Sequence, residues 1–324
     1  MITRLGGSDR YSTAAIISST MLKTSRTAIL VAGQDPIDSQ DVNYYYDALV
    51  TVPLAVAYDA PLLLMSKDNI VDYTETELKR LKVRNLIVVN TNNAISSTVK
   101  TKLSNLKCNI TYIESNTCFE TAVKVANALQ SKIDEYFNTL FFITNNSFAD
   151  ALSISPVAAI KSSPILYLNN TGAMNSATYN YLKSVKGKIK NAYIIGGTAV
   201  ISDAMMNDVA SILGLTVNST VIRIFGATRY ETCVAVNNRF KSTLISDDIC
   251  VATGLYFADA LTGGVYAAKT KQAVLLADLS KGSTTLLDCQ STYLKSKKPS
   301  NITVFGDTGA VPTSLVNLIQ QASK

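Results

Sequence analysis

The sequence contains no histidine among its 324 residues. Histidine is the usual general base near neutral pH, the proton carrier of Ser-His-Asp arrangements and the most common metal ligand in proteins. Its absence removes the most familiar hydrolase centres and most metal sites from consideration. We therefore predict no metal site and no histidine-dependent catalysis.

Motifs that would indicate a cofactor are also missing. No Cys-x-x-Cys pair of the zinc or thioredoxin type occurs among the five cysteines, which are Cys108, Cys118, Cys233, Cys250 and Cys289. No Gly-x-Gly-x-x-Gly sequence and no Walker loop follows an apolar run. For an α/β chain of this size, these absences predict a protein that is not an enzyme and binds no cofactor.

Neither membrane insertion nor nucleic-acid binding is indicated. No apolar run reaches the roughly 18 residues that a transmembrane helix needs. The formal net charge of +6 is modest, and no dense basic stretch carries interleaved aromatic residues. Met1 stands directly against the first motif, so we expect either a removed leader or a segment of a longer protein.

What the sequence does contain is one motif in three copies. The segment RLGGSDRYST at residues 4–13 returns as RIFGATRYET at 223–232, and a degenerate copy, YIESNTCFET, occupies 112–121. A unit of about 110 residues has the size of an ordinary domain and can hold its own core. We therefore predict three homologous domains, at residues 1–107, 108–218 and 219–324.

A second marker keeps step with the first. An aromatic residue stands two positions before an aspartate in YYDAL, FADAL and FADAL, at residues 45–49, 148–152 and 257–261. The aspartates are Asp47, Asp150 and Asp259. A carboxylate is stabilised at a helix N-terminus, and these three persist even in the unit whose motif has lost its arginines. We interpret them as structural residues.

Apolar runs alternate with helical segments along each unit. In the third unit, residues 220–225 predict a strand and residues 230–243 the helix that follows it. Continuous apolar strands between helices are typical of a parallel sheet that is covered on both faces. The predicted fold is α/β, with three tandem Rossmann-like domains and mostly parallel sheets.

The strand–turn–helix motif is the candidate binding site, at Arg4, Gly7, Arg10 and Tyr11 in the first copy and Arg223, Gly226, Arg229 and Tyr230 in the third. Free N–H groups at a helix start attract anions, and two arginines beside them can hold phosphate or carboxylate. Alternatively, the arginines form structural ion pairs with Asp47 and Asp259. For the tyrosines, a packed ring is favoured over a sugar-stacking platform. The middle unit, which lacks both arginines, is formally neutral, whereas the other two are positive.

The markers together resemble those of the cell wall binding repeat 2 family, over essentially the whole chain. The resemblance implies three Rossmann-like domains packed within one chain about a pseudo-threefold axis. It implies non-covalent anchoring of a secreted protein at the cell wall or S-layer, through an anionic wall polysaccharide, as in the anchoring region of clostridial surface proteins. Neighbouring S-layer proteins are further possible partners. Any enzymatic or adhesive activity would reside in a separate domain.

Two other functions stay open at this point. The chain can be a structural lattice module that contacts neighbouring proteins rather than glycan. Less favoured is a phosphate-ester hydrolase that uses Asp47, Asp150 or Asp259. In the anchoring hypothesis, the polymer-binding residues are the arginines, glycines and tyrosines of the first and third motifs.

Overall fold

Strands and helices alternate along the whole chain in the computed structural model, which describes residues 1–34, 45–91, 94–170, 172–277 and 285–324. The strands form three sheets of four, and every strand pairing among the described residues is parallel. The predicted α/β class and the predicted parallel sheets are confirmed.

Each sheet has the same order relative to its own part of the chain. The first sheet is β3 (Leu62–Met65), β2 (Thr27–Ala32), β4 (Asn85–Thr91) and β5 (Asn109–Ser115). The second is β7 (Ile165–Leu168), β6 (Thr139–Thr144), β8 (Asn191–Ile195) and β9 (Val221–Ile224). The third is β11 (Ala273–Ala277), β10 (Ile249–Thr253), β12 (Ile302–Phe305) and β1 (Ile2–Leu5).

The fourth strand of every sheet comes from another sequence repeat. Strand β5 opens the second repeat but completes the first sheet, and β9 opens the third repeat but completes the second sheet. Strand β1 closes the cycle, since Ile2 pairs in register with Ile302 of the third sheet. The sheets therefore cross the predicted boundaries at 107/108 and 218/219. One buried cluster runs through all three units, so that their cores are continuous.

Helices cover the sheets. In the first third of the chain they are α1 (Arg10–Met21), α2 (Tyr46–Leu49), α3 (Val52–Ala57), α4 (Asp72–Leu81) and α5 (Ser97–Ser104). The middle third contributes α6 (Cys118–Ile133), α7 (Ala149–Ile160), α8 (Ser176–Val185) and α9 (Asp203–Leu213). The last contributes α10 (Arg229–Arg239), α11 (Ala258–Thr270), α12 (Asp288–Lys297) and α13 (Thr313–Ala322).

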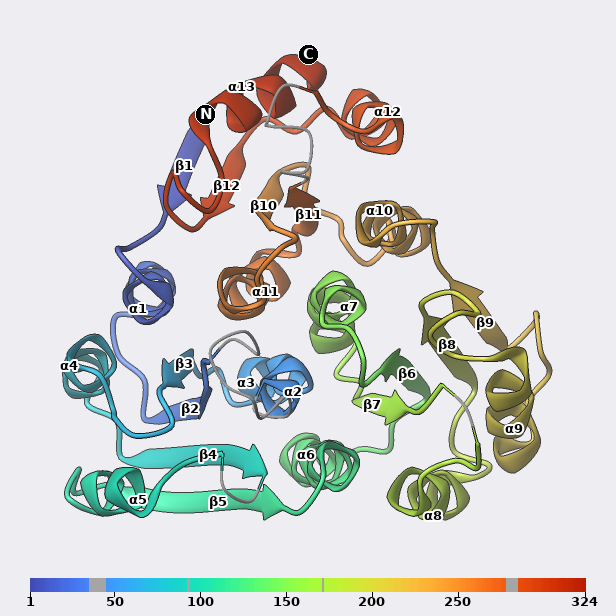
Figure 1. Cartoon of the computed structure of the whole chain (residues 1–324), viewed down its shortest axis with the longest axis horizontal. Coiled ribbons are helices and arrows are strands. Elements are labelled where there is room, and N and C mark those ends of the chain that lie inside the picture. The colour runs from blue at the N-terminus through green and yellow to red at the C-terminus, as the bar shows by residue number, and fades with distance from the viewer. Residues whose placement is uncertain (35–44, 92–93, 171, 278–284) are drawn as a thin grey trace.

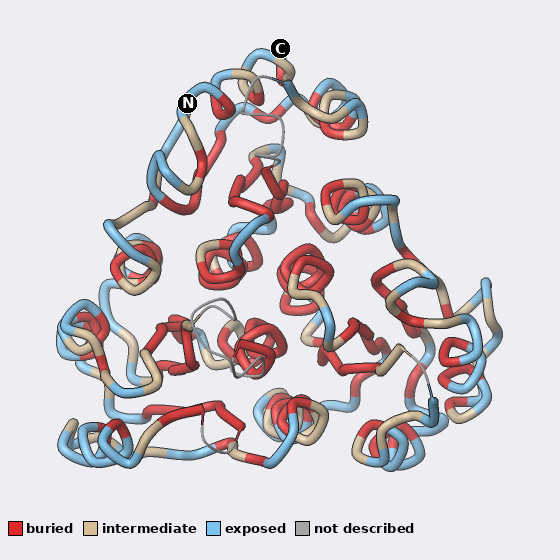
Figure 2. The backbone as a smooth tube through the Cα atoms, viewed as in Figure 1, coloured by how far each residue is buried: buried red, intermediate tan, exposed pale blue. Residues whose placement is uncertain are grey.

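Three helices pack against one another at the centre, with the sheets around them as the sides of a triangle (Figure 1). These helices, α3, α7 and α11, are pairwise in contact. They are buried almost throughout, whereas the outer helices expose one side (Figure 2). The arrangement is the pseudo-threefold one that the resemblance implied.

An aromatic cluster marks the axis. It consists of Tyr45, Phe148 and Phe257, the residues at one equivalent position of the three aspartate markers. Ring centroids are 5.4 Å apart for Tyr45 and Phe257, 6.1 Å for Tyr45 and Phe148, and 6.4 Å for Phe148 and Phe257. A residue close to a threefold axis meets its own equivalents, so the repeat of one sequence position produces the cluster.

Candidate functional site

The strand–turn–helix motif spans the junction between two structural units. Strand β1 belongs to the third sheet, but helix α1 packs on β3 of the first sheet and on α11. In the same way β9 belongs to the second sheet, whereas α10 packs on β11 of the third sheet and on α7. Each motif therefore ties one unit to the next around the ring.

The first arginine of the motif holds the turn that follows the neighbouring strand. Arg4 donates from Nη1 to the carbonyls of Gly306 (2.9 Å) and Asp307 (2.8 Å), and from Nη2 to that of Val311 (2.9 Å). Burial lowers the pKa of Arg4, and the charge of Asp307 opposes that shift. These backbone carbonyls occupy donors that an anion would need.

Arg223 repeats this arrangement at the second sheet. Its Nη1 donates to the carbonyl of Gly196 (2.9 Å), and its Nη2 donates to the carbonyl of Ser202 (3.3 Å) and to Oδ1 of Asp203 (3.1 Å). The carbonyls lie in the turn that leads from β8 to α9, equivalent to the turn held by Arg4. Arg4 thus fixes the turn that follows β12, and Arg223 fixes the turn that follows β8.

The second arginine of the motif holds the end of the strand that follows its helix. Arg10 donates from Nη1 to the carbonyl of Gly33, and Arg229 donates to that of Gly254, each at 2.6 Å. The Arg229 guanidinium carbon lies 5.3 Å from the ring centroid of Phe148. Its charge also lowers the pKa of Asp150 against the larger effect of burial. Arg229 therefore contacts the third sheet's strand end and acts on the second unit's aspartate.

The motif aspartates lie against the turns that the first arginines hold. A Cβ added to Gly196 would stand 2.9 Å from Oδ2 of Asp150, and one added to Gly306 would stand 2.5 Å from Oδ2 of Asp259. Both glycines also have positive φ, +118° and +100°, a backbone that favours glycine. They make a tight turn and leave room for the carboxylate.

Asp47 is the exception among the three. In the degenerate copy of the motif, Cys118 stands where the other copies have their second arginine, and it lies beside Asp47. The exposed fraction of Asp47 is 1%. The backbone N–H of Thr91 donates to its Oδ2 at 2.5 Å, while its buried Oδ1 has no hydrogen-bond partner among the residues that the structure describes. Burial raises the pKa of Asp47 to about 7, and burial followed by the charge of Asp47 raises the pKa of Cys118 to about 12.

The structure changes one of the two predicted arginine partners, Asp47. Arg229 acts on Asp150, which the sequence had not paired with any arginine, whereas Asp47 faces the cysteine of the degenerate copy. The reason is that β9 of the third motif lies in the second sheet, so that Arg229 meets the aspartate of the preceding unit. Burial raises the pKa of Asp47, and no arginine of the motif stands beside this carboxyl to lower it.

We expect Asp47→Asn to remove a specific pH dependence of stability. A carboxyl whose pKa is higher in the folded state stabilises the fold below its unfolded pKa of 3.8, and this stabilisation is lost as pH rises toward about 7. The loss is about 4 kcal/mol at 1.36 kcal/mol per pKa unit. Urea unfolding at several pH values between 4 and 7.5 should show that the free energy of unfolding of the variant increases relative to that of the wild type as pH rises. A difference independent of pH would contradict the assignment.

The helix starts that were candidates for anion binding are already occupied by side chains. Asp9 accepts a hydrogen bond from the N–H of Ser12 at 2.7 Å in a complete capping box. Thr228 does the same for Glu231 at 3.3 Å. A capping oxygen satisfies one of the free N–H groups of the first turn. Together with the arginine contacts, these caps support the structural alternative, and polymer contact by the motif residues stays a prediction.

The glycines and tyrosines of the motif are packed. Gly7 and Gly226 donate from their N–H groups to Thr13 Oγ1 (3.1 Å) and Thr232 Oγ1 (3.0 Å). A Cβ on either would overlap the following helix turn. The Tyr230 ring is buried against Gly254, and Tyr11 approaches Gly33 in the equivalent place. This is the packed ring that the sequence favoured.

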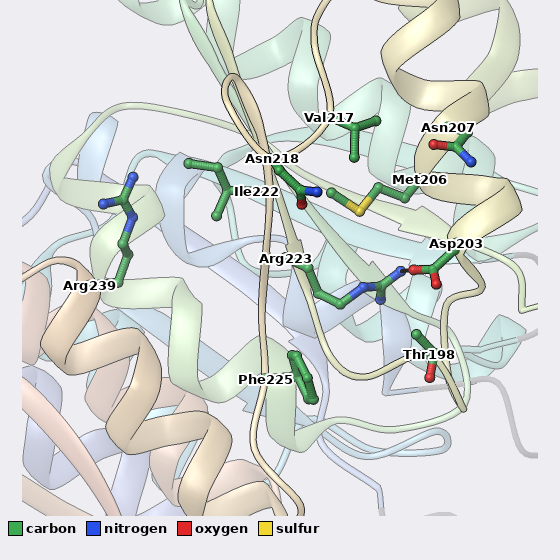
Figure 3. Close-up of a pocket in the computed structure, with 10 residues that line it drawn as sticks. All are labelled: Thr198, Asp203, Met206, Asn207, Val217, Asn218, Ile222, Arg223, Phe225 and Arg239. Carbon is green, nitrogen blue, oxygen red and sulfur yellow. Dashed lines mark hydrogen bonds and ion pairs between the residues drawn. The ribbon is translucent and has the colours of Figure 1, made fainter.

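The third motif borders an open cavity of about 680 Å³. Figure 3 shows its lining, where the side chain of Arg223 points to Asp203. Phe225, one residue beyond β9, is 54% exposed at its rim, and Arg239 supplies a second cation. The amides of Asn207 and Asn218 complete a mixed aromatic, cationic and amide surface. Sequence reasoning missed this site, since Phe225 replaces the Gly6 of the first motif.

The first motif has a smaller and more acidic cavity. Its volume is about 160 Å³, and its lining includes Asp9, Asp259 and Asp307 beside Arg10. Three carboxylates against one guanidinium disfavour an anionic ligand. The first and third motifs, which the sequence treats as equivalent, therefore present different surfaces.

In the described part of the chain, no group of three Cys, Asp or Glu residues could hold a metal ion. No helix among the described residues has the length and apolar character to cross a bilayer. Asp47 and Asp150 are buried, which argues against their use on a phosphate ester.

The family model Cell wall binding domain 2 (CWB2) matches residues 4–100, 113–206 and 223–316. The chain therefore belongs to the CWB2 family, in three tandem copies, and cell wall binding is what the family and the relatives below support.

Two relatives come from Bacillus subtilis (strain 168). N-acetylmuramoyl-L-alanine amidase LytC is 32% identical over 98% of this chain and 58% of its own length. Amidase enhancer is 28% identical over 84% of this chain and 34% of its own length. The chain thus spans little more than half of the one and about a third of the other.

Two solved structures from Clostridium difficile share the fold. Cwp6 has a TM-score of 0.87 at 27% identity, over 100% of this chain and 48% of that one. Cwp8 has a TM-score of 0.83 at 25% identity, over 99% of this chain and 51% of that one. In both, the region similar to this chain is about half of the molecule.

Proposed function

We propose that this chain anchors a secreted protein to the Gram-positive cell wall by binding an anionic wall polysaccharide without a covalent bond, and that it catalyses no reaction itself. Membership of the CWB2 family supports wall association. The net charge of +6 favours a negatively charged polymer over a neutral one. The observation that carries the proposal is the cavity beside the third motif.

The chemistry of that cavity suits a charged sugar. An exposed aromatic ring such as Phe225 offers a flat apolar surface to the face of a pyranose, and the amides of Asn207 and Asn218 match its hydroxyl groups. Arg239 is exposed at one end, with its guanidinium carbon 5.7 Å from the ring centroid of Tyr193. It can pair with a phosphate or carboxylate of the same polymer.

Weak sites can still give firm attachment. A solvent-exposed ion pair contributes only about 0–1 kcal/mol. Two or more such sites on one rigid body that engage a repeating polymer gain avidity of about 10²–10⁴. The continuous core through all three units makes the chain such a rigid body.

The proposal predicts that Phe225→Ala combined with Arg239→Gln weakens binding to wall sacculi by about tenfold or more, at about 1.4 kcal/mol per tenfold. Both side chains are exposed, so the fold should be unaffected. Cosedimentation with sacculi at two salt concentrations measures the effect. Tyr136→Ala is a matched control, because this exposed aromatic ring lies away from the cavity.

The same assay tests the polymer itself. Binding by the wild type should disappear after acid extraction of the anionic polymer and should weaken at higher salt. Binding that survives extraction would refute the polysaccharide proposal and favour peptidoglycan or neighbouring proteins as the partner. Concentration-dependent assembly without any wall material would favour the lattice module.

A further inference from the structure

A second concentration of positive charge lies in the first unit, away from every motif. Three loops meet at the amino-terminal ends of β2, β4 and β5, and backbone hydrogen bonds hold them together. The N–H of Arg84 donates to Arg26 (2.9 Å), that of Asn109 to Arg84 (2.7 Å), and that of Ser25 to Leu81 (3.1 Å). The loops carry five exposed cations, which we name the basic corner: Lys23, Arg26, Lys82, Arg84 and Lys107.

The charges of the basic corner are not neutralised within the described part of the chain. None of its five side chains has an ion pair there. Two carboxylates of α4 are already paired, Glu75 with Lys79 at 2.5 Å and Glu77 with Arg80 at 2.6 Å. The corner therefore keeps an excess of positive charge.

Two of the lysines occupy backbone positions that favour glycine. Lys82 has φ +59° and Lys107 has φ +51°, and a left-handed conformation costs a non-glycine residue about 1–2 kcal/mol. Attraction to the C-terminus of a helix explains Lys82, which caps α4. It does not explain Lys107, because α5 ends at Ser104 and the effect fades within the last turn. Lys271 and Lys298 have the same conformation but cap α11 and α12, so that among the described lysines of this kind Lys107 is the one whose charge has no helix end to stabilise.

A cavity of about 340 Å³ separates these two lysines. Its lining combines the apolar Leu78, Val83 and Leu106 with three lysines, Lys79, Lys82 and Lys107, and with one carboxylate, Glu75, which is paired with Lys79. Apolar side chains beside an excess of cations suit the ring of a sugar and an attached anionic group. The basic corner thus lies at the amino-terminal ends of the strands, whereas the motif arginines contact the turns at the carboxyl ends.

We propose that the basic corner is a second polymer subsite, which binds the phosphate or carboxylate groups of the wall polysaccharide. This rests on the proposed function and extends it, since none of its residues belongs to the motif. The corner lies beside α4 and α5, and the cavity of Figure 3 lies beside α9, at another corner of the triangle (Figure 1). One long polymer can engage both, which is the geometry that avidity requires.

The test uses lysine-to-glycine changes, because glycine accepts the left-handed backbone without strain. Lys82→Gly with Lys107→Gly removes two charges and should leave the free energy of unfolding unchanged or raise it. Its affinity for intact sacculi should fall about tenfold, or about 1.4 kcal/mol. The control is Lys100→Gln with Lys124→Gln, which removes two exposed charges away from the cavity and should change affinity by less than about twofold.

The outcomes separate this proposal from the function on which it rests. If the wild type binds intact but not acid-extracted sacculi and only the glycine variant is weakened, the basic corner is a subsite. If both double variants lose affinity equally, the effect is net charge and the subsite is refuted. If the glycine variant binds as the wild type does, the subsite is refuted while the polysaccharide function stands. If wild-type binding is indifferent to extraction, the function itself fails.

Discussion

Replacing Phe257 with alanine is expected to cost about 3–5 kcal/mol of unfolding free energy, the usual range for a fully buried phenylalanine. Its exposed fraction is 0%, and its ring meets those of Tyr45 and Phe148 at the pseudo-threefold axis. Aromatic pairs of this kind contribute about 0.5–1.5 kcal/mol beyond the buried area. Phe257 contacts residues of both other units, so the cavity left by the alanine should destabilise the packing of all three.

The shape of the unfolding transition is as informative as its midpoint. Because one buried cluster joins the sheets, we expect a single cooperative transition in the wild type and in the variant, only shifted to lower denaturant. Phe225→Ala is the matched control: its ring is 54% exposed, and a surface substitution should change stability by no more than about 0.5 kcal/mol. A separate loss of the third unit in Phe257→Ala would contradict the single core.

Much of this fold could be predicted from the sequence because the evidence is local. Strands such as Ala273–Ala277 are short, apolar and flanked by helical segments, and this pattern requires a parallel sheet covered on both sides. Even the central cluster follows once a threefold axis is assumed, since Tyr45, Phe148 and Phe257 share one position in the repeat.

The boundaries of the units could not be predicted, for a reason that applies to any closed cycle of repeats. Similarity gives the period of a repeat but not the point at which one structural unit ends. Strand β9 was therefore assigned to the third unit, although it pairs with β8 of the second. The partner of each motif arginine depends on that point, so Asp150 was missed as the carboxylate near Arg229.

The candidate site was harder to predict than the fold because its features are not repeated. Phe225 and Arg239 stand beside only one of the three motifs, and Gly6 takes the place of Phe225 in the first. Lys82 and Lys107 are notable only because of a backbone angle that the sequence does not show. A residue that the fold requires recurs in every repeat and can be recognised from that recurrence, whereas a ligand-binding residue present in one unit does not recur.

Arg229→Met is expected to destabilise the protein by about 2–3 kcal/mol, below the 3–5 kcal/mol of a fully buried pair because the guanidinium is half-buried. The change removes the hydrogen bond to Gly254, the contact with the Phe148 ring and the charge that opposes the burial of Asp150. Burial already raises the pKa of Asp150 to about 6. Without Arg229 that pKa should rise further, so the loss should be largest near neutral pH and smaller in acid, as urea unfolding can measure.

Adding Asp150→Asn to Arg229→Met tests whether Arg229 stabilises the contact between two units or binds the polymer. The second change removes the buried charge, and most of the lost stability should return, as a double-mutant cycle would show. The second repeat accommodates Cys118 beside Asp47 in the same way, without an arginine. The refolded double variant is then assayed on wall sacculi. Normal retention would make Arg229 a clamp between units, whereas lost retention in a stable protein would establish it as a polymer contact.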